Sequence, residues 1–518
     1  MGDNLWIIEA DGKVERFGKM LKEADVKGEV FATGGHLLTS PKSLSPLGID
    51  RNGRDLRLPV RESRIRRLGE KIGEAEAVYL ATDPDDEGEV IANDIRNFAR
   101  SKRPDLPIHR VRLHALHPEC LLRSVGVPPD SGPPINPLPG TVRRVVDRMI
   151  GGTLSKGGPV GRVFSAFLGD IARTPPVLGR VVLRCPALIG ADYTAVVPVT
   201  KKNRDEFGKG KWILDSPAPP GGEKTVFRLP PYSFGEVLSD LRREDGISIA
   251  ESARRIQSLY ERGKISYPRT DALGLSRETA EFLRPMASKW GLSRFDPGLV
   301  PAPDPVSPHE ALHPLADPFE IKDPTDRTIV ERIARRALFS GLPPRLVEVP
   351  DPSSLPAWAR DLGLSRPAVR FGPEREKSPR EGLFLDSPDV VILSVLVSSG
   401  LGRPSTLPVH VEKIVSRGVM NLDGSLSRDG RKFLEASPEV LRSADFTRKM
   451  EESLRHASGK ESVRGLMEKI LGPLPDEIRK RMTESLDDEV ETVRWEDFFQ
   501  KSDPEREGIG KDMSPSLG

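Results

Sequence analysis

Cysteine is nearly absent from this chain, which has two cysteines, Cys120 and Cys185, among 518 residues. Two cysteines cannot build a disulfide framework, a four-cysteine zinc ribbon or an iron–sulfur site, and their scarcity indicates a reducing compartment. Long apolar runs are also missing, since none approaches the roughly 18 residues that a membrane span needs. The start of the chain, MGDNLWIIEADGK, has no basic region followed by a long apolar core. We therefore expect a cytoplasmic protein with no membrane partner.

The chain also has no large excess of charge of either sign. It contains 79 Lys and Arg and 77 Asp and Glu, which gives a net charge of +2. Any binding of nucleic acid must then come from local clusters of charge. With 37% hydrophobic and 30% charged residues the chain has the composition of a globular protein. At roughly 150 residues per domain, its length predicts three or four domains.

The first part of the sequence has the alternation of an α/β domain. Apolar runs in LWIIEA, EVFATG and AVYLATD alternate with helical patterns in RFGKMLKEA and EVIANDIRNFAR. This order predicts a mainly parallel sheet that ends near residue 122, before the proline-rich linker VGVPPDSGPPINPLPG. A helix through TVRRVVDRMIGGTLS follows. Antiparallel strands are expected over 181–228, and further helices over 236–263 and through most of 431–500.

An acidic motif, DPDDEGE, follows the apolar run AVYLAT. Ligands of open α/β sheets bind at the carboxyl ends of the strands, and Asp83, Asp85 and Glu87 are spaced so that their oxygens can converge on Mg²⁺. Glu9 ends the strand LWIIEA in the same topological position, and Lys13 follows where it could reach a bound phosphate. A solvated acidic turn would have the same composition.

A calcium loop is an alternative reading of the same segment. Residues 83–94 carry acids at positions 1, 3, 5 and 12 and Gly88 at position 6. Such a loop needs an entering helix, whereas AVYLAT has the composition of a strand.

The segment HEALH, residues 309–313, matches the zinc-protease pattern H-E-x-x-H. That pattern needs a helix long enough to place both imidazoles on one face. Pro308 and Pro314 bracket the segment and leave barely more than a turn, and Glu320 and Glu331 compete as third ligand. A zinc-dependent hydrolase stays an alternative function.

A tyrosine and an arginine, Tyr267 and Arg269, lie two residues apart in the extended stretch ISYPRTDA. Both side chains then project from the same side, where the guanidinium could stabilise a phenolate and a phosphate together. A phenol with a pKa near 10 needs such help to act as a nucleophile. An ordinary strand tyrosine remains the other interpretation.

Two glycine-containing turns carry candidate phosphate ligands. GLGRPST places Arg403, Ser405 and Thr406 before a predicted helix, whose first backbone amides suit an anion. GRVFSAF places Arg162 after a glycine-rich run. A plain turn with a capped helix would look the same in each case.

In sequence order these motifs resemble those of the type IA DNA topoisomerases, over the chain to about residue 460. LWIIEADGK, ATGGHLL, ATDPDDEGEVIA, VDRMIGGTLS, GRVFSAFLGDI, ISYPRTDA, HEALHP and GLGRPST each have a similar counterpart in that family.

The resemblance implies an enzyme that cuts and reseals one DNA strand through a 5′-phosphotyrosyl intermediate and so relaxes negative supercoils without ATP. Tyr267 would be the nucleophile and Arg269 its electrostatic partner, while Glu9 would act as acid and base, assisted by Lys13. Mg²⁺ would be held by Asp83, Asp85, Glu87 and Glu9. DNA contacts are implied for His36, Arg162, His309, Arg403, Ser405 and Thr406. Single-stranded or underwound DNA is the expected partner, with RNA left open, and a monomer is expected.

The implied fold is a multidomain α/β plus α+β ring. Residues 1–122 would form a toprim metal-binding domain, 123–180 with 396–518 a helical DNA-binding domain, 181–228 with 349–395 a β-rich arch, and 229–348 the domain with the nucleophilic tyrosine. Two cysteines exclude tandem zinc ribbons, and no helicase-like P-loop precedes the first domain.

Four positions depart from the family pattern. Asp86 stands where arginine is usual, Phe164 where glutamine is, His313 where arginine is, and Ala272 where serine is. Each exchange removes a potential contact to phosphate or DNA. A DNA-binding protein of this fold with lost or altered cleavage is therefore a further alternative.

Overall fold

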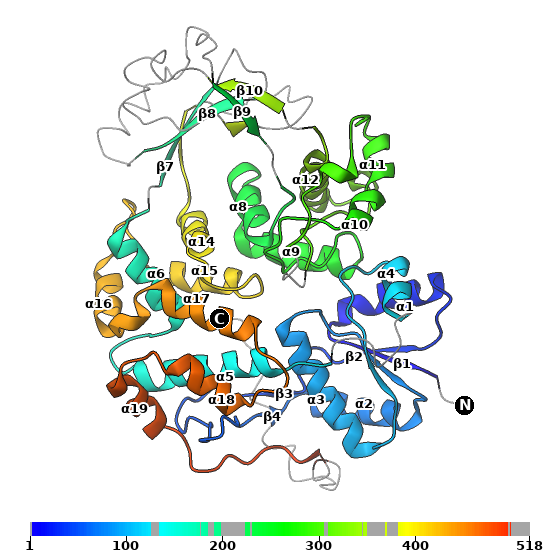
Figure 1. Cartoon of the computed structure of the whole chain (residues 1–518), viewed down its shortest axis with the longest axis vertical. Coiled ribbons are helices and arrows are strands. Elements are labelled where there is room, and N and C mark those ends of the chain that lie inside the picture. Colours follow the sequence, from blue (N-terminus) through cyan, green and yellow to red (C-terminus); the bar gives the residue numbers. More distant parts are fainter. Residues whose placement is uncertain are drawn as a thin grey trace.

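The computed structural model describes residues 3–125, 134–176, 178–184, 191–197, 223–227, 230–304, 309–343, 345–349, 368–369, 382–495 and 498. Figure 1 shows the elements arranged as a ring, with a parallel sheet and a group of helices at one end and antiparallel strands at the other. Among the described residues, no helix is both long and apolar enough to cross a membrane. Cys185 and Pro308 lie outside the described residues, as does most of the proline-rich stretch after residue 349.

The N-terminal domain has a four-stranded sheet in the order β2 (Glu29–Ala32), β1 (Leu5–Ile8), β5 (Val78–Leu80) and β6 (Ile108–Arg110). All three strand pairs are parallel, which confirms the predicted sheet. Successive side chains of a strand face opposite sides. Trp6 and Ile8 accordingly pack with residues of α1 (Val14–Glu23), whereas Leu5 and Ile7 pack with residues of α2 (Glu62–Glu74) and α3 (Asp86–Lys102).

A second apolar core lies between helices from distant parts of the chain. One cluster of buried side chains contains Val142, Val145 and Met149 of α5 (Leu138–Leu154) together with Met450 and Leu454 of α17 (Ala444–Arg455). The neighbouring helices are α6 (Arg162–Arg173), α15 (Leu407–Ser416), α16 (Arg428–Ala436), α18 (Val463–Leu471) and α19 (Asp476–Glu484). A short hairpin of β3 (Leu38–Thr39) and β4 (Leu58–Pro59) lies near α5 (Figure 1).

The far end of the ring is built from antiparallel strands, as the sequence predicts. One sheet has the order β11 (Ala368–Val369), β8 (Ala191–Val197), β7 (Gly179–Arg184) and β12 (Gly382–Leu385); β10 (Arg345–Val349) pairs with β9 (Glu223–Phe227). Directly after β12 the chain forms helix α14 (Pro388–Ser398), which contacts α8 and α15. The stretch expected to be β-rich up to residue 395 thus ends in a helix.

The remaining helices flank the segment that carries Tyr267. They are α4 (Pro118–Val125), α8 (Phe234–Glu244), α9 (Ile249–Glu261), α10 (Arg277–Phe282), α11 (Arg284–Lys289) and α12 (Pro324–Ser340). Between α9 and α10 the backbone is irregular, and it forms isolated antiparallel bridges such as Ile265 with Pro314. Leu312 of HEALH forms a similar bridge with Tyr232. HEALH is therefore not helical, so the helix that a zinc-protease motif requires is missing.

Candidate active site

The carboxyl ends of β1 and β5 bring the predicted acids together. The two strands are neighbours, with Ile7 aligned to Leu80, so that Glu9 and Asp83 follow adjacent strand ends. The two acids, which the sequence placed at equivalent strand ends, therefore lie at one edge of the sheet. A strand enters the acidic motif, so the calcium-loop alternative lacks its entering helix.

Helix α3 begins directly against this edge, with Asp85 as its N-cap. Oδ1 of Asp85 accepts a hydrogen bond of 2.8 Å from the amide of Gly88, as expected of an N-cap aspartate. A Cβ on Gly88 would lie 2.0 Å from the carbonyl oxygen of Asp83. Only glycine therefore lets the first turn of α3 approach the strand end so closely.

Lys13 and Asp83 form an ion pair, and each side chain is only 2% exposed. The Tyr260 hydroxyl adds a hydrogen bond of 3.3 Å to Oδ1 of Asp83. Burial by itself raises the pKa of Asp83, but the charge of Lys13, the hydrogen bonds from Glu9 and Lys13 and the charge of Arg269 together outweigh burial and lower the pKa to about 2. Asp83 is thus held ionised, and Lys13 lies among the acids rather than in the open cavity.

Glu9 keeps its proton, whereas Asp83 is ionised. Burial, and next the charge of Asp83, raise the pKa of Glu9 well above its ordinary value. Among the described residues, Oε2 of Glu9 and Oδ2 of Asp83 are buried atoms without a hydrogen-bond partner. The site therefore contains a carboxyl group that holds its proton, together with two buried oxygens available to a ligand.

Tyr267 reaches this acidic edge from the irregular segment between α9 and α10. Its hydroxyl donates a hydrogen bond of 2.6 Å to Oδ2 of Asp85. Its ring centre lies 5.1 Å from that of His309 and 5.5 Å from that of Tyr260. Burial, and next the charge of Asp85, raise the pKa of Tyr267 well above 10. In this state Tyr267 is a neutral phenol with its proton directed at a carboxylate.

Arg269 supplies the positive charge predicted beside the tyrosine. Burial would lower its pKa, but the charges of Tyr267 and Asp85 raise it above the ordinary value. Burial also lowers the pKa of the adjacent His309 imidazole to about 3, so this ring is uncharged at neutral pH. Arg269 thus stays positively charged and interacts electrostatically with Tyr267 and the neighbouring acids.

Glu87, the third acid of the motif, points elsewhere. Its Oε1 lies 3.1 Å from Nε2 of His36, and this contact lowers the pKa of Glu87. In the described part of the chain, no three His, Cys, Asp or Glu side chains are arranged to hold a metal ion. Glu9 and Asp83, with their unpartnered oxygens, nevertheless have the chemistry of a site for a hard cation.

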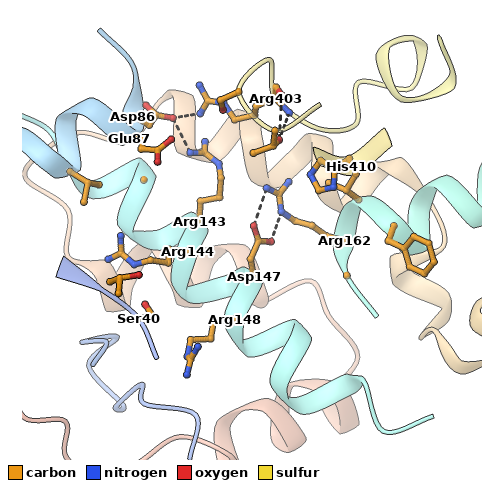
Figure 2. Close-up of a pocket in the computed structure, with 18 of the residues that line it drawn as sticks. Ser40, Asp86, Glu87, Arg143, Arg144, Asp147, Arg148, Arg162, Arg403 and His410 are labelled. Atoms are coloured by element: carbon orange, nitrogen blue, oxygen red, sulfur yellow. Dashed lines mark hydrogen bonds and ion pairs between the residues drawn. The ribbon is translucent and has the colours of Figure 1, made fainter. Parts of the chain in front are cut away.

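A cavity of about 640 Å³ opens next to the acids (Figure 2). Helix α5 forms one wall, from which Arg143, Arg144 and Arg148 project. Lys413 of α15 and Arg417, which follows the end of α15, also line the cavity. The acids Asp85, Asp86 and Glu87 also line it. The cavity therefore joins a basic surface to the acidic edge that holds Tyr267.

Five of the six predicted DNA contacts line this cavity, namely His36, Arg162, Arg403, Ser405 and Thr406. His309 does not line it and instead lies against the Tyr267 ring. Arg162 is only 6% exposed, because it pairs with Asp147 at 2.6 Å and Glu451 at 2.9 Å. In this structure Arg162 of α6 is therefore joined to α5 and α17 by these two ion pairs.

The basic wall of α5 was not among the residues singled out from the sequence. The signal was present in TVRRVVDRM, where Arg143 and Asp147, and likewise Arg144 and Arg148, lie four residues apart and so share one side of a helix. Tyr260 was also missed. It lies on the amphipathic helix α9, where nothing in the sequence separates it from an ordinary core aromatic.

The four departures from the family pattern have distinct surroundings. Asp86 pairs with Arg143 and Arg403. Arg417 lies over the ring of Phe164, 4.4 Å from its centre. His313 is buried, with Nδ1 3.1 Å from the carbonyl oxygen of Ala311, and the Ala272 amide donates to Thr270. Each substituted residue thus has a partner inside the protein.

Residues 4–116 match the Toprim domain family. The chain is 25% identical to DNA topoisomerase 1 of Aquifex aeolicus over 553 aligned residues, which cover 90% of this chain and 98% of that protein. It is 26% identical to reverse gyrase 2 of Aquifex aeolicus, over 75% of this chain and 37% of the relative. For DNA topoisomerase 1 of Zymomonas mobilis the identity is 23%, over 88% of this chain and 44% of the relative. The chain thus spans less than half of the latter two relatives.

The full-length topoisomerase I of Thermotoga maritima has a similar structure, with a TM-score of 0.60 at 18% identity. The similarity covers 93% of this chain and 90% of that one. This likeness concerns the fold, and it agrees with the multidomain arrangement expected from the sequence. The chain is therefore a homologue of DNA topoisomerase 1 and reverse gyrase that contains a Toprim domain and has the fold of a topoisomerase I.

Proposed function

We propose that this protein is a type IA DNA topoisomerase that cuts one DNA strand, passes a strand through the break and reseals it. The observation that carries the proposal is the hydrogen bond of 2.6 Å between the Tyr267 hydroxyl and Asp85. It brings the Tyr267 hydroxyl to the acidic edge of the Toprim sheet, beside a basic cavity, and so supports the role of Tyr267 as nucleophile. The names of the homologues point to the same reaction.

In the proposed reaction Tyr267 Oη attacks phosphorus and the bond from phosphorus to the 3′-oxygen breaks. Asp85, which already accepts the phenolic hydrogen bond, takes the proton. Arg269 stabilises the phenolate and the phosphate charge. The Glu9 carboxyl, protonated because of its raised pKa, gives its proton to the leaving 3′-oxygen. Resealing reverses these steps and needs no nucleotide, since one phosphodiester is exchanged for another.

Mg²⁺ is the proposed cofactor, because carboxylates clustered at the strand ends favour a hard divalent cation and the match to the Toprim family is in keeping with a metal-binding domain. Asp83 would hold the ion through its unpartnered oxygen, with Asp85 next to it, and Glu9 would join them as a ligand only after it has given up its proton. When bound, Mg²⁺ would neutralise the clustered carboxylates and orient the phosphate. Glu87 would join this set only after leaving His36.

Single-stranded or underwound DNA is the proposed partner, bound in the basic cavity by His36, Arg403, Ser405 and Thr406. Arginine and lysine side chains favour the phosphate backbone whatever the sequence, so RNA is also a candidate strand. A monomer suffices, since all the groups named come from one chain.

The domain division that we propose follows the sequence. The Toprim domain comprises 1–122, the helical domain 123–180 with 396–518, and the tyrosine-bearing domain 229–348. The arch comprises 181–228 with 349–395, although helix α14 at its end contacts α8 and α15.

The alternatives have less support. A zinc hydrolase needs both HEALH imidazoles on a helix, and this segment is not helical. A protein that binds DNA without cleaving it would keep the cavity, but such a protein has no need of the contact between Tyr267 and Asp85.

A covalent-trapping experiment tests the proposal. An end-labelled single-stranded oligonucleotide is incubated with the protein and Mg²⁺, quenched with denaturant and separated on a denaturing gel. We expect a labelled adduct that is lost in Tyr267→Phe. Tyr232→Phe is the matched control, because Tyr232 donates an equally short hydrogen bond of 2.6 Å to Asp240 away from the site. No adduct in any sample, despite measurable binding, would favour the non-cleaving alternative.

A further inference from the structure

The basic cavity already contains an anion that belongs to the protein. Arg143 on α5 and Arg403 in the loop before α15 both donate to the same oxygen, Oδ2 of Asp86 (Figure 2). The distance from Nη1 of Arg143 is 2.9 Å. Two guanidinium groups that converge on one oxygen form an arrangement that also suits a phosphate.

The fold holds this arrangement in place from two sides. Asp86 is the first residue of α3, and a Cβ on Gly140 of α5 would lie 2.7 Å from the Asp86 carbonyl oxygen, so the two helices approach closely. Arg143 is also fixed from behind, since Glu451 accepts its Nη2 at 2.8 Å. The orientation of Arg143 is therefore set by the protein and not by a ligand.

Arg403 is held less firmly. Asp86 is the only acid that pairs with its guanidinium in the described part of the chain, and the Arg403 side chain is 31% exposed. Arg403 lies in the turn of GLGRPST, where Gly400 and Gly402 have φ values of +65° and +79°. Removal of the Asp86 charge would leave Arg403 free to take another anion.

The position of this pair connects it to the proposed chemistry. Asp86 follows Asp85, which accepts the Tyr267 hydroxyl, and both residues line the cavity. A phosphate between Arg143 and Arg403 would then lie close to the phosphate attacked by Tyr267, on the same strand.

We propose that Arg143 and Arg403 form a binding subsite for a backbone phosphodiester, and that Asp86 occupies this subsite until a DNA strand displaces it. Asp86 is thus an internal competitor of DNA. The inference rests on the proposed function for the identity of the strand, whereas the competition between Asp86 and a phosphate anion stands independently of it.

The test compares Asp86→Asn, Arg403→Gln and the double variant with the unmodified protein. Binding of a fluorescent single-stranded oligonucleotide is measured by anisotropy over a range of salt, and binding of inorganic tripolyphosphate by calorimetry. Asp245→Asn is the matched control, because Asp245 pairs with Arg332 at 2.7 Å outside the cavity. Thermal unfolding checks that each variant is folded, and Asp86→Ser replaces Asp86→Asn if that variant is not.

We expect Asp86→Asn to bind both probes about fivefold more tightly at low salt. A change of this size corresponds to the free energy of a partly exposed ion pair. The slope of log K against log salt should steepen by about 0.7 for the oligonucleotide, as for one further phosphate contact on a single strand. In the Arg403→Gln background the same substitution should have much less effect, and Asp245→Asn should change nothing.

Unchanged or weaker binding of both probes by Asp86→Asn overturns the inference, as does equal tightening by Asp245→Asn. Tighter tripolyphosphate binding without oligonucleotide binding by any variant supports the competition and contradicts the proposed function. Oligonucleotide binding that Asp86→Asn leaves unchanged contradicts the inference while the proposed function stands.

Discussion

The Tyr267 hydroxyl and the Asp85 carboxylate are joined by a hydrogen bond of 2.6 Å, although 182 positions separate them in the chain. Asp85 also caps α3 through its other oxygen, which fixes the direction of the carboxylate. The acceptor of the tyrosine proton is thus part of a helix start and does not depend on a flexible side chain. Burial, and next the charge of this carboxylate, raise the pKa of Tyr267 and so disfavour the phenolate. In the proposed mechanism Asp85 receives the proton when Tyr267 attacks a phosphate.

The first prediction concerns Asp85→Asn, which keeps a hydrogen-bond acceptor but cannot take up a proton. Adduct formation at neutral pH should fall by about 10²–10⁴, the usual contribution of a general base. Loss of the Asp85 charge also lowers the pKa of Tyr267, so adduct formation by the variant should recover as the pH rises. Rates of covalent trapping between pH 6 and 10 measure both effects.

Asp240→Asn is the control for this prediction, since it removes the acceptor of the Tyr232 hydroxyl outside the site. Its trapping rate should match that of the unmodified protein. An Asp85→Asn rate that equals the unmodified rate at neutral pH would remove Asp85 from the mechanism.

A second prediction concerns the buried ion pair of Lys13 and Asp83. Lys13→Met or Asp83→Asn alone leaves a buried charge without its partner and should destabilise the sheet by about 3–5 kcal/mol. The double variant should lose clearly less than the sum, because no unpaired charge remains. Amide hydrogen exchange of β1 and β5 measures the local stability of this domain. Strictly additive losses would show that the two charges are not coupled.

A third prediction concerns the pH dependence set by Glu9. Because its pKa is raised in the folded protein, the folded state binds the Glu9 proton more tightly than the unfolded state, and this contribution is lost as the pH rises through the folded pKa. Glu9→Gln mimics the protonated form, so its Tm should exceed that of the unmodified protein at pH 8. The difference should shrink toward the unfolded Glu pKa of about 4.3.

Glu15→Gln, on the exposed side of α1, is the control and should shift Tm little at either pH. The pH dependence of stability that comes from Asp83 has the opposite sign to that from Glu9. Its pKa is lowered to about 2, so its stabilisation is present at neutral pH and disappears as the pH falls from about 4 toward 2. A Glu9→Gln protein that is less stable than the unmodified one at pH 8 would contradict this assignment of charge.

A fourth prediction concerns Gly88→Ala. The new Cβ would overlap the Asp83 carbonyl oxygen, 2.0 Å away, and would push α3 from the strand end. We expect a loss of about 1–3 kcal/mol and a displaced Asp85, with loss of the covalent adduct. Gly73→Ala in α2 has no atom within 4 Å of the new Cβ and should stabilise by about 0.4–1 kcal/mol. Equal stability of the two variants would show that the close approach is unimportant.

The fifth prediction concerns the direction of relaxation. A single tyrosine cuts one strand at a time, and binding of bases requires the duplex to be open. Negatively supercoiled plasmid should therefore be relaxed, with a rate that falls steeply with salt, whereas positively supercoiled plasmid should be nearly untouched. Topoisomer ladders on plasmids of either sign, with and without a single-stranded bubble, measure this. Equal relaxation of both signs on fully paired DNA would contradict the proposed mechanism.

The sequence by itself determined the local structure of the site. Alternation of apolar runs and helical patterns predicted the parallel sheet, because strand and helix periods are properties of short segments. The sequence also placed Glu9 and Asp83 each at the carboxyl end of a strand, where ligands of parallel sheets bind, whereas the order of the strands in the sheet made them neighbours. The prolines around HEALH correctly argued against a long helix there.

Tertiary structure decided which of these groups contact one another. The pairing of Tyr267 with Asp85, of Glu87 with His36, and of Asp86 with Arg143 and Arg403 joins segments between 51 and 317 positions apart. Periodicity within a segment carries no information about such contacts, because they depend on how the ring closes. The protonation states of Glu9 and Asp83 follow for the same reason, since burial and neighbouring charge are properties of the assembled site.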